Sequence, residues 1–286
     1  MIQALQSMLA LDFMRNAFVT GGAIALSAGL VGYFVVLRNQ VFTADALGHV
    51  AFTGSLGGLL TGLNLLTGVF GSCIAVAVAI GTLGGRGRGR DVAVGTVFAW
   101  VLGLGVLFLS LYTTSFSAAN GNLGVSVLFG SILSLQPAQV VVASLAAVVT
   151  LVATLVVARP LLFMSLDPDV ARARGVPTGL LGLAFMVVVA ITVAEAVQAV
   201  GALLIFALLV TPAATAQNVS SRPWLGMLLS ATAALAIVWA GLVLAYFVFY
   251  PASFFMTTLA FVLYLGSRFI PKRRVRPLLR KASGSS

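Results

Sequence analysis

Long runs of apolar residues, separated by short polar stretches, constrain this chain more than any other feature of its sequence. Eight runs are long enough, or nearly long enough, to cross a bilayer, and they cover residues 17–37, 47–61, 65–83, 92–111, 140–158, 180–194, 200–216 and 224–250. A transmembrane helix needs about 20 consecutive, mostly apolar residues. Only 8% of the 286 residues are charged, whereas a soluble domain carries about 25%. The sequence therefore predicts an all-α, polytopic membrane bundle that forms one domain over residues 1–286.

The positions of the basic residues indicate how many runs cross. Two further runs, 123–135 and 254–269, are short. If 254–269 crosses and 123–135 is a half-helix or an interfacial piece, every basic residue except Arg15 falls on one side of the membrane. Cytoplasmic loops carry an excess of Lys and Arg. This pattern favours nine transmembrane helices over eight, with a basic cytoplasmic tail over about residues 268–286.

The net charge of +10 follows from this topology, and no nucleic-acid partner is expected. The RGRGR stretch within residues 84–91 lacks aromatic residues and lies between two apolar runs. Membrane lipid is the expected surrounding, and no removable signal peptide is expected at the N-terminus. The single cysteine, Cys73, cannot form a disulfide within one chain. The final ASGSS has the composition of a flexible tail or a cloning scar.

The stretch DALGH contains Asp45 and the only histidine, His49. Thr43 is a plausible N-cap, which would place Asp45 in the first turn of a helix and both side chains on one face. One interpretation is structural: the helix dipole favours Asp45, and His49 is a hydrogen-bonded interface residue. The other is functional, because ionisable residues inside a membrane are costly. Imidazole nitrogen and carboxylate oxygen both bind divalent transition metals.

A polar insert at about residues 159–179 separates two apolar runs. Asp167 is expected to cap a short helix, with Asp169 in its first turn, where the helix dipole favours an anion. Arg172 lies toward the end of this helix, and Gly175 is expected to stop it. The insert is either an ordinary solvated loop helix on the cytoplasmic face or a docking element for a soluble partner.

Three stretches, in order, resemble the permease subunits of ATP-binding-cassette importers of the zinc/manganese type. VVLRNQVFTADALGHVAFTGSLGG resembles the family segment that follows the first span, with Gly48 where the family commonly has serine. SLDPDVARARGVP resembles the coupling segment, and VGALLIFALLVTPAATA resembles a later span. The residues that the resemblance assigns to ATPase coupling are Asp167, Asp169, Ala171, Arg172 and Gly175.

The resemblance implies a homodimer of permease subunits with two ATPase subunits and an extracellular metal-binding protein, in the plasma membrane of a prokaryote. The chain lacks a G-x-x-x-x-G-K-[ST] phosphate loop, so ATP is expected on the partner ATPase. No enzymatic activity and no tightly bound cofactor are expected. The substrate would be a divalent metal, and the sequence does not separate zinc, manganese and iron. Asp45 and His49 from two copies would form a transient site of two nitrogen and two oxygen ligands on the translocation path.

Two further residues have open interpretations. Pro212 cannot donate a backbone hydrogen bond, so it marks either a tolerated kink or a bend that lines the path. Glu195 falls between two apolar runs on the outer side, where it is either a surface carboxylate or a ligand at the metal entry.

Two rival functions remain. A permease for iron chelates, haem or cobalamin would usually be longer and needs no intramembrane Asp–His pair. A secondary transporter or channel driven by an ion gradient would not need a coupling-like helix or a basic cytoplasmic face.

Overall fold

The computed structural model describes residues 8, 10–83, 88–115, 130, 132–202, 204–248 and 250–269. Within these ranges all regular structure is helical, which confirms the expected fold class. The elements in chain order are α2 (Asp12–Leu37), α3 (Val41–Leu60), α4 (Leu65–Leu83), α5 (Arg88–Ser115), the 3₁₀ turn η2 (Ile132–Ser134), α7 (Pro137–Leu166), α8 (Pro168–Ala173), α9 (Thr178–Val200), α10 (Ile205–Leu209), α11 (Thr211–Val219), α12 (Pro223–Val248) and α13 (Ala252–Arg268).

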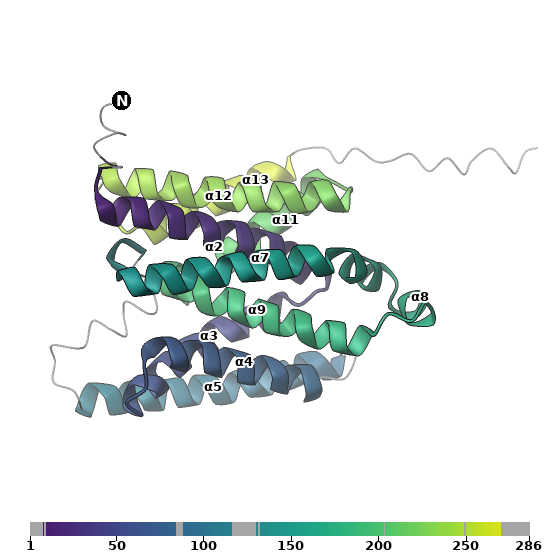
Figure 1. Ribbon diagram of the computed structural model, residues 1–286, viewed down its shortest axis with the longest axis horizontal. Coiled ribbons are helices and arrows are strands. Elements are labelled where there is room, and N and C mark those ends of the chain that lie inside the picture. Colours follow the sequence, from purple (N-terminus) through teal and green to yellow (C-terminus); the bar gives the residue numbers. More distant parts are fainter. Residues whose placement is uncertain are drawn as a thin grey trace, which may run out of the picture.

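The long helices run roughly side by side, as Figure 1 shows. One group consists of α2, α11, α12 and α13, and a second consists of α3, α4 and α5; α7 and α9 lie between them. The short helix α8 projects beyond one end of the bundle. Helix α2 is the central element, because it packs against α7, α9, α11 and α12.

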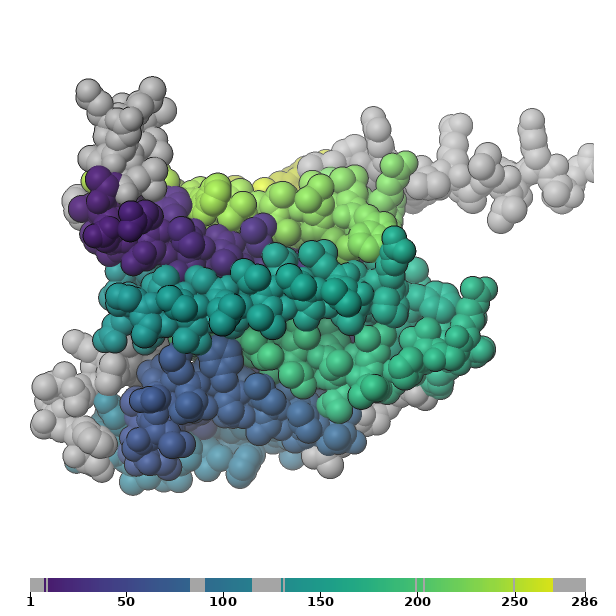
Figure 2. Space-filling view, in the orientation of Figure 1, coloured from purple at the N-terminus to yellow at the C-terminus, as the bar shows by residue number. Residues whose placement is uncertain are grey.

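In the described part of the chain, six helices are long and apolar enough to cross a membrane: α2, α4, α5, α7, α9 and α12. The buried share of these apolar helices differs widely, and several expose most of their apolar residues at least partly. The apolar window of α2 is 78% buried, whereas those of α5 and α7 are only 17% and 22% buried. Large apolar side chains such as Val106 on α5 and Val156 on α7 are exposed, and Figure 2 shows α7 on the outside of the bundle. Outward-facing apolar surface on this scale suits lipid rather than water.

Several of the expected runs have different boundaries in the structure, and three of them bear on the site. The run 200–216 is not one helix, because α9 ends at Val200 and the chain then forms two short helices, α10 and α11. The run 140–158 continues as α7 through Pro160 to Leu166, so the polar insert begins later than expected. The run 47–61 starts earlier, at Val41. Most of 123–135, the loop at 120–124 and the tail beyond residue 269 lie outside the described residues.

Small residues let α3 lie unusually close to α4. A Cβ added to Gly54 would overlap Ser72, and one added to Gly58 would lie 3.0 Å from the Cα of Gly68. Backbones can approach this closely only where small residues face each other. The Ser72 hydroxyl also donates to the Val50 carbonyl at 3.4 Å. Helix α3 is therefore held in a fixed register on α4, which fixes the position of every side chain along it.

Candidate functional site

Asp45 and His49 lie one turn apart on α3, and both are partly exposed while their neighbours along the helix are buried. Asp45 borders a narrow gap between α3 and α10, which is too small to admit water. In the described part of the chain, neither side chain forms an ion pair. The structure thus brings the two predicted residues together on the less covered face of α3. That part of the chain holds no group of three or more His, Cys, Asp or Glu side chains that could bind a metal.

The expected helix cap at Thr43 is wrong. Helix α3 begins at Val41 after Gln40, and no acidic residue lies in its first turn. Thr43 is a buried residue inside the helix. Because the dipole effect falls off within the first turn, helix-start stabilisation no longer explains why Asp45 is present.

The imidazole of His49 contacts an aromatic ring from another helix. Its ring centroid lies 5.2 Å from that of Phe98 on α5, and the two planes are inclined at 65°. Phe98 in turn contacts Phe42 edge-on, with centroids 5.8 Å apart. An edge-to-face pair of this kind restricts the orientation of the imidazole. Sequence reasoning missed Phe98, because nothing along the chain links residue 98 to residue 49.

Gly48, the residue between the pair, allows the next part of the chain to approach α3. A Cβ at Gly48 would lie 3.0 Å from Cγ2 of Ile205 and 3.3 Å from the Ala202 carbonyl. The serine that the zinc/manganese permeases commonly have here would force these neighbours to shift by a few tenths of an ångström. The departure at Gly48 is therefore linked to the close packing of α10 on the Asp45 helix.

Pro212 lies in the first turn of α11, immediately after the break that separates α10 from α11 at Val210. The helix is therefore interrupted at this point. The break lies against α2, since a Cβ at Gly32 would overlap the Leu209 carbonyl. The interruption is thus packed into the bundle and positions α10 beside Asp45.

An open groove runs along the outer face of the broken segment. Its volume is about 490 Å³, and it is lined by Phe206, Ala207, Val210, Thr211, Ala214, Thr257, Phe261 and Tyr264. Phe206 and Val210 also line the gap next to Asp45. The groove is mostly apolar, and Phe206 and Val210 separate it from the gap at Asp45.

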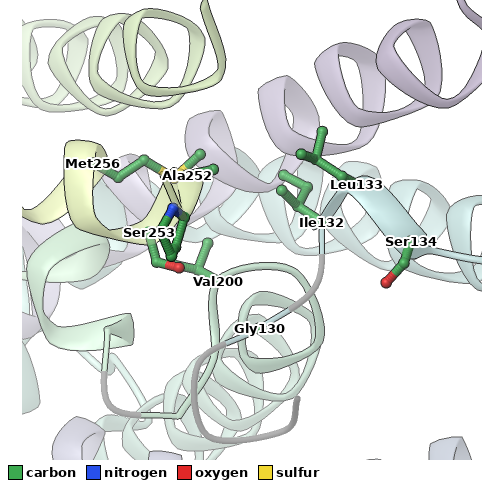
Figure 3. A pocket seen from close by; sticks show the side chains of 9 residues that line it. Gly130, Ile132, Leu133, Ser134, Val200, Ala252, Ser253 and Met256 are labelled. Atoms are coloured by element: carbon green, nitrogen blue, oxygen red, sulfur yellow. The ribbon is translucent and has the colours of Figure 1, made fainter. Parts of the chain in front are cut away.

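A second cavity, of about 180 Å³, lies where η2, the end of α9 and the start of α13 meet (Figure 3). Ile132, Leu133, Val200, Ala252 and Met256 give it a mainly apolar lining. It contains none of the predicted site residues.

Helix α8 has the predicted caps. The Asp167 carboxylate accepts hydrogen bonds from the backbone N–H groups of Asp169 and Val170, at 3.1 and 3.0 Å. Gly175, which follows the helix, has a φ of +81°, a conformation that favours glycine. These contacts explain why a six-residue helix forms here.

The surface of α8 is polar on one side and apolar on another. Asp169 and Arg172 form an exposed ion pair at 3.6 Å, and Val170 and the preceding Leu166 are exposed. Ala171, by contrast, is fully buried. A soluble partner could reach the exposed side chains but not that of Ala171.

Glu195 lies inside α9, so the expectation of a surface or entry carboxylate is wrong. Its side chain is fully buried, and its Oε1 is 2.6 Å from the hydroxyl of Ser27 on α2. The apolar window ended at Glu195 only because the residue is charged, whereas the helix continues to Val200. The structure separates Glu195 from Asp45 and His49, which lie on another face of the bundle.

Comparisons with known proteins give a consistent result. A family model described as the ABC 3 transport family matches residues 10–270. The manganese import system permease protein ScaB of Streptococcus parasanguinis is 32% identical over 222 residues, which is 77% of each chain. The manganese transport system membrane protein MntC of Listeria monocytogenes is 26% identical over 219 residues, 76% of each chain.

Two solved structures share the fold. A chain of PsaBC from Streptococcus pneumoniae, in complex with Fab, superposes with a TM-score of 0.81 and 27% identity, covering 96% of this chain and 98% of that one. A metal-chelate type ABC transporter in an inward-facing conformation gives a TM-score of 0.70 at 17% identity, covering 94% and 91%. At that identity the second likeness concerns the fold alone.

Proposed function

This chain belongs to the ABC 3 transport family, and from that premise we propose that it is the membrane-spanning permease of an ATP-driven importer for manganese or a closely related divalent metal. The relatives named for manganese transport support this cargo. The observation that carries the proposal is the placement of Asp45 and His49. They are an oxygen and a nitrogen ligand on one partly exposed helix face, inside an otherwise apolar bundle.

The metal site is proposed to need a second copy of the chain. One carboxylate and one imidazole are too few ligands for a divalent ion. A twofold axis beside α3 and α10 would bring in the same pair from the partner. The apolar groove between α10–α11 and α13 shares the lining residues Phe206 and Val210 with the gap at Asp45. The second copy is therefore the occupant that would cover this groove and complete the site at once.

The pair suits transit rather than storage. The site contains no thiolate ligand. The single cysteine, Cys73, donates to the Leu47 carbonyl at 3.7 Å, and Leu47 lies on the opposite face of α3 from Asp45 and His49. A ligating histidine must be neutral, so metal affinity should weaken as the pH becomes acidic. The rival reading as a chelate or cobalamin permease leaves the Asp–His pair without a role.

The orientation follows from charge. The start of α12 and the end of α13 lie at the same end of the bundle as α8, and the start of α2 lies at the other end (Figure 1). The described basic residues at the α8 end include Arg159, Arg172, Arg174, Arg222 and Arg268. The positive-inside rule makes this end cytoplasmic.

We propose that α8 contacts a separate ATPase there through Leu166, Asp169, Val170 and Ala173. We also propose that nine segments cross the membrane, with α10 and α11 together forming one of them.

The proposal is tested by reconstituting the chain into vesicles with and without its ATPase. Uptake of radiolabelled Mn²⁺ is expected only when both proteins and ATP are present, because the chain lacks a phosphate loop. ATP hydrolysis by the purified chain alone, or Mn²⁺ uptake without ATP, would contradict it. A cysteine at Ala173 should cross-link to the ATPase, and a cysteine at the buried Ala171 serves as the matched control.

A further inference from the structure

Glu195 is a buried acidic residue that the metal site does not use. It lies in the second half of α9, and its side chain is fully buried. The two ion pairs of the described residues, Asp12–Arg15 and Asp169–Arg172, are both exposed and far from it along the chain. A carboxylate that is ionised, buried and unpaired is strongly unfavourable. Something in the structure must therefore offset or remove its charge.

Polar groups from two other helices surround this carboxyl group. Ser27 on α2 lies 2.6 Å from Oε1 and is itself fully buried. Thr150 on α7 lies beside the same carboxyl group. Among the described residues, no hydrogen-bond partner reaches Oε2 of Glu195 or the hydroxyl of Thr192, one turn earlier on α9. The acid thus lies at a junction of α2, α7 and α9.

The hydrogens at this junction indicate the state of the acid. Ser27 has one hydroxyl hydrogen but two oxygens within reach, the Ile24 carbonyl at 3.0 Å and Glu195 Oε1 at 2.6 Å. If the acid is protonated, it donates to Ser27, and Ser27 donates to Ile24, so each of these hydrogens has an acceptor. If it is ionised, Ser27 donates to Oε1, but Oε2 keeps a buried negative charge without a donor. The neutral arrangement has the lower desolvation cost.

We propose that Glu195 and Ser27 form a proton-binding site that links α9 to α2 within the membrane. The bound species is a single proton, which converts the carboxylate to the acid and is shared along the 2.6 Å contact. A metal cation would need several oxygen ligands at bonding distance, whereas a proton needs only this pair.

The site is placed to influence the metal path. From Glu195, α9 continues to Val200, and a short turn then leads to α10, whose Ile205 and Phe206 border the gap at Asp45. Loss of the proton leaves an unpaired buried charge between α2 and α9, which weakens the attachment of the segment that carries α10. Transport is therefore expected to fall as the pH rises and the proton is removed. This consequence rests on the proposed function, whereas the proton site does not.

Within the described ranges, no hydrogen bond or ion pair joins this carboxyl group to another titratable group. Those on the described elements packed against α9 are Asp12, Arg15, Tyr33 and Arg38 on or after α2, Asp45 and His49 on α3, Cys73 on α4, Arg159 on α7, and Asp167, Asp169, Arg172 and Arg174 at α8. Among the described side chains, Ser27 is the one that forms a hydrogen bond with Glu195, and the Thr150 hydroxyl beside it donates to backbone carbonyls of α7. A pH response that depends on Glu195 should therefore disappear when this one residue is changed.

The direct test is infrared difference spectroscopy on the purified chain in lipid, comparing the parent with Glu195→Gln at neutral pH. We expect the carbonyl band of a protonated carboxylic acid in the parent and its absence in the variant. Ser27→Ala should shift the band, because the acid loses its acceptor, and Asp12→Asn, which changes an exposed acid, should leave it unchanged. If Glu195→Gln does not accumulate, the shift in Ser27→Ala carries the test. A parent without the band, or a band that Ser27→Ala does not move, would overturn the site.

The second test measures Mn²⁺ uptake against pH in vesicles that contain the ATPase. Uptake by the parent should fall by about threefold or more on the alkaline side, the size expected for loss of one internal hydrogen bond, while Glu195→Gln should keep most of its uptake. An equal decline in Mn²⁺ uptake by both proteins at alkaline pH would overturn the link between the proton and transport. A decline in the parent that added sodium ions prevent would also overturn it, because a cation other than the proton would then occupy the site. Complete absence of Mn²⁺ uptake in the parent would contradict the proposed function and leave the infrared result standing.

Discussion

Asp45 and Glu195 are two acidic residues inside apolar helices, and their surroundings differ in nearly every respect. Asp45 is partly exposed, lies one turn from an imidazole, and borders a narrow gap that shares Phe206 and Val210 with an apolar groove. Glu195 is fully buried and meets the hydroxyl of Ser27. In the proposed account, the first environment leaves the lone pairs of Asp45 available to a metal that a second copy also binds, and the second leaves room only for a proton. The two carboxyl groups would then serve different roles because packing, rather than residue type, determines what can reach them.

The largest expected effect among the following variants comes from Asp45→Asn. This change removes the negative charge from the site formed by Asp45 and His49 (the open site) and keeps the shape of the side chain. Uptake of Mn²⁺ should fall by more than about tenfold, since even outer-shell changes around metal sites cost 10–100-fold. Association with the ATPase should persist, because α8 lies at the end of the bundle. Co-purification of the ATPase with the variant checks this, and undiminished uptake would remove Asp45 from the site.

A smaller effect is expected at Gly32, where α2 meets the helix break that forms one wall of the open site. Gly32→Ala places a Cβ against the Leu209 carbonyl, and overpacking of this kind costs about 1–3 kcal/mol. Thermal unfolding in detergent should occur at lower temperature, and uptake should decrease with it. Gly71→Ala on α4, where a Cβ meets nothing within 4 Å, is the matched control. Equal behaviour of the two variants would show that the close contact has no consequence.

Phe98→Leu is expected to have the next smaller effect on metal uptake through the open site. It removes the ring that lies 5.2 Å from the imidazole of His49, and such pairs contribute about 0.5–1.5 kcal/mol. The KM for Mn²⁺ should rise by about twofold to tenfold with little change in maximal rate, because 1.4 kcal/mol corresponds to tenfold. Phe42→Leu, which alters a ring in contact with Phe98, should do less. A fall in maximal rate at constant KM would mean that Phe98 acts elsewhere in the cycle.

The smallest effect is expected far from both acids, at α8. Asp167→Ala removes the cap of this helix, at a cost of about 0.5–2 kcal/mol in local helix stability. Cross-linking from position 173 to the ATPase should become less efficient, and Asp167→Asn, which keeps a capping side chain, should restore it. Identical cross-linking in all three proteins would indicate that the cap does not position α8.

Features that depend on local sequence could be predicted. Apolar runs predicted the helical membrane bundle, and Asp167 and Gly175 predicted the limits of α8, because caps and turns are set by neighbouring residues. The spacing of Asp45 and His49 likewise places them on one face of any helix that contains both.

Features that depend on tertiary packing could not. Ser27 is separated from Glu195 by 168 positions, so no local pattern links the two residues, and the charge of Glu195 made the end of the apolar run look like a loop. The start of α3 was misplaced because Gln40 provides no side-chain cap. The break at Val210 is stabilised by the close approach of α2 at Gly32, which a linear pattern does not contain.

The central claim is that Asp45 and His49, and not the buried Glu195, bind the transported metal. The most direct measurement is uptake of radiolabelled Mn²⁺ by vesicles that contain the ATPase and the His49→Ala variant, with Asp12→Asn as the control for an acid outside both sites. The account predicts uptake at the background level for His49→Ala and at the parental level for Asp12→Asn. Uptake by His49→Ala at the parental rate would contradict it.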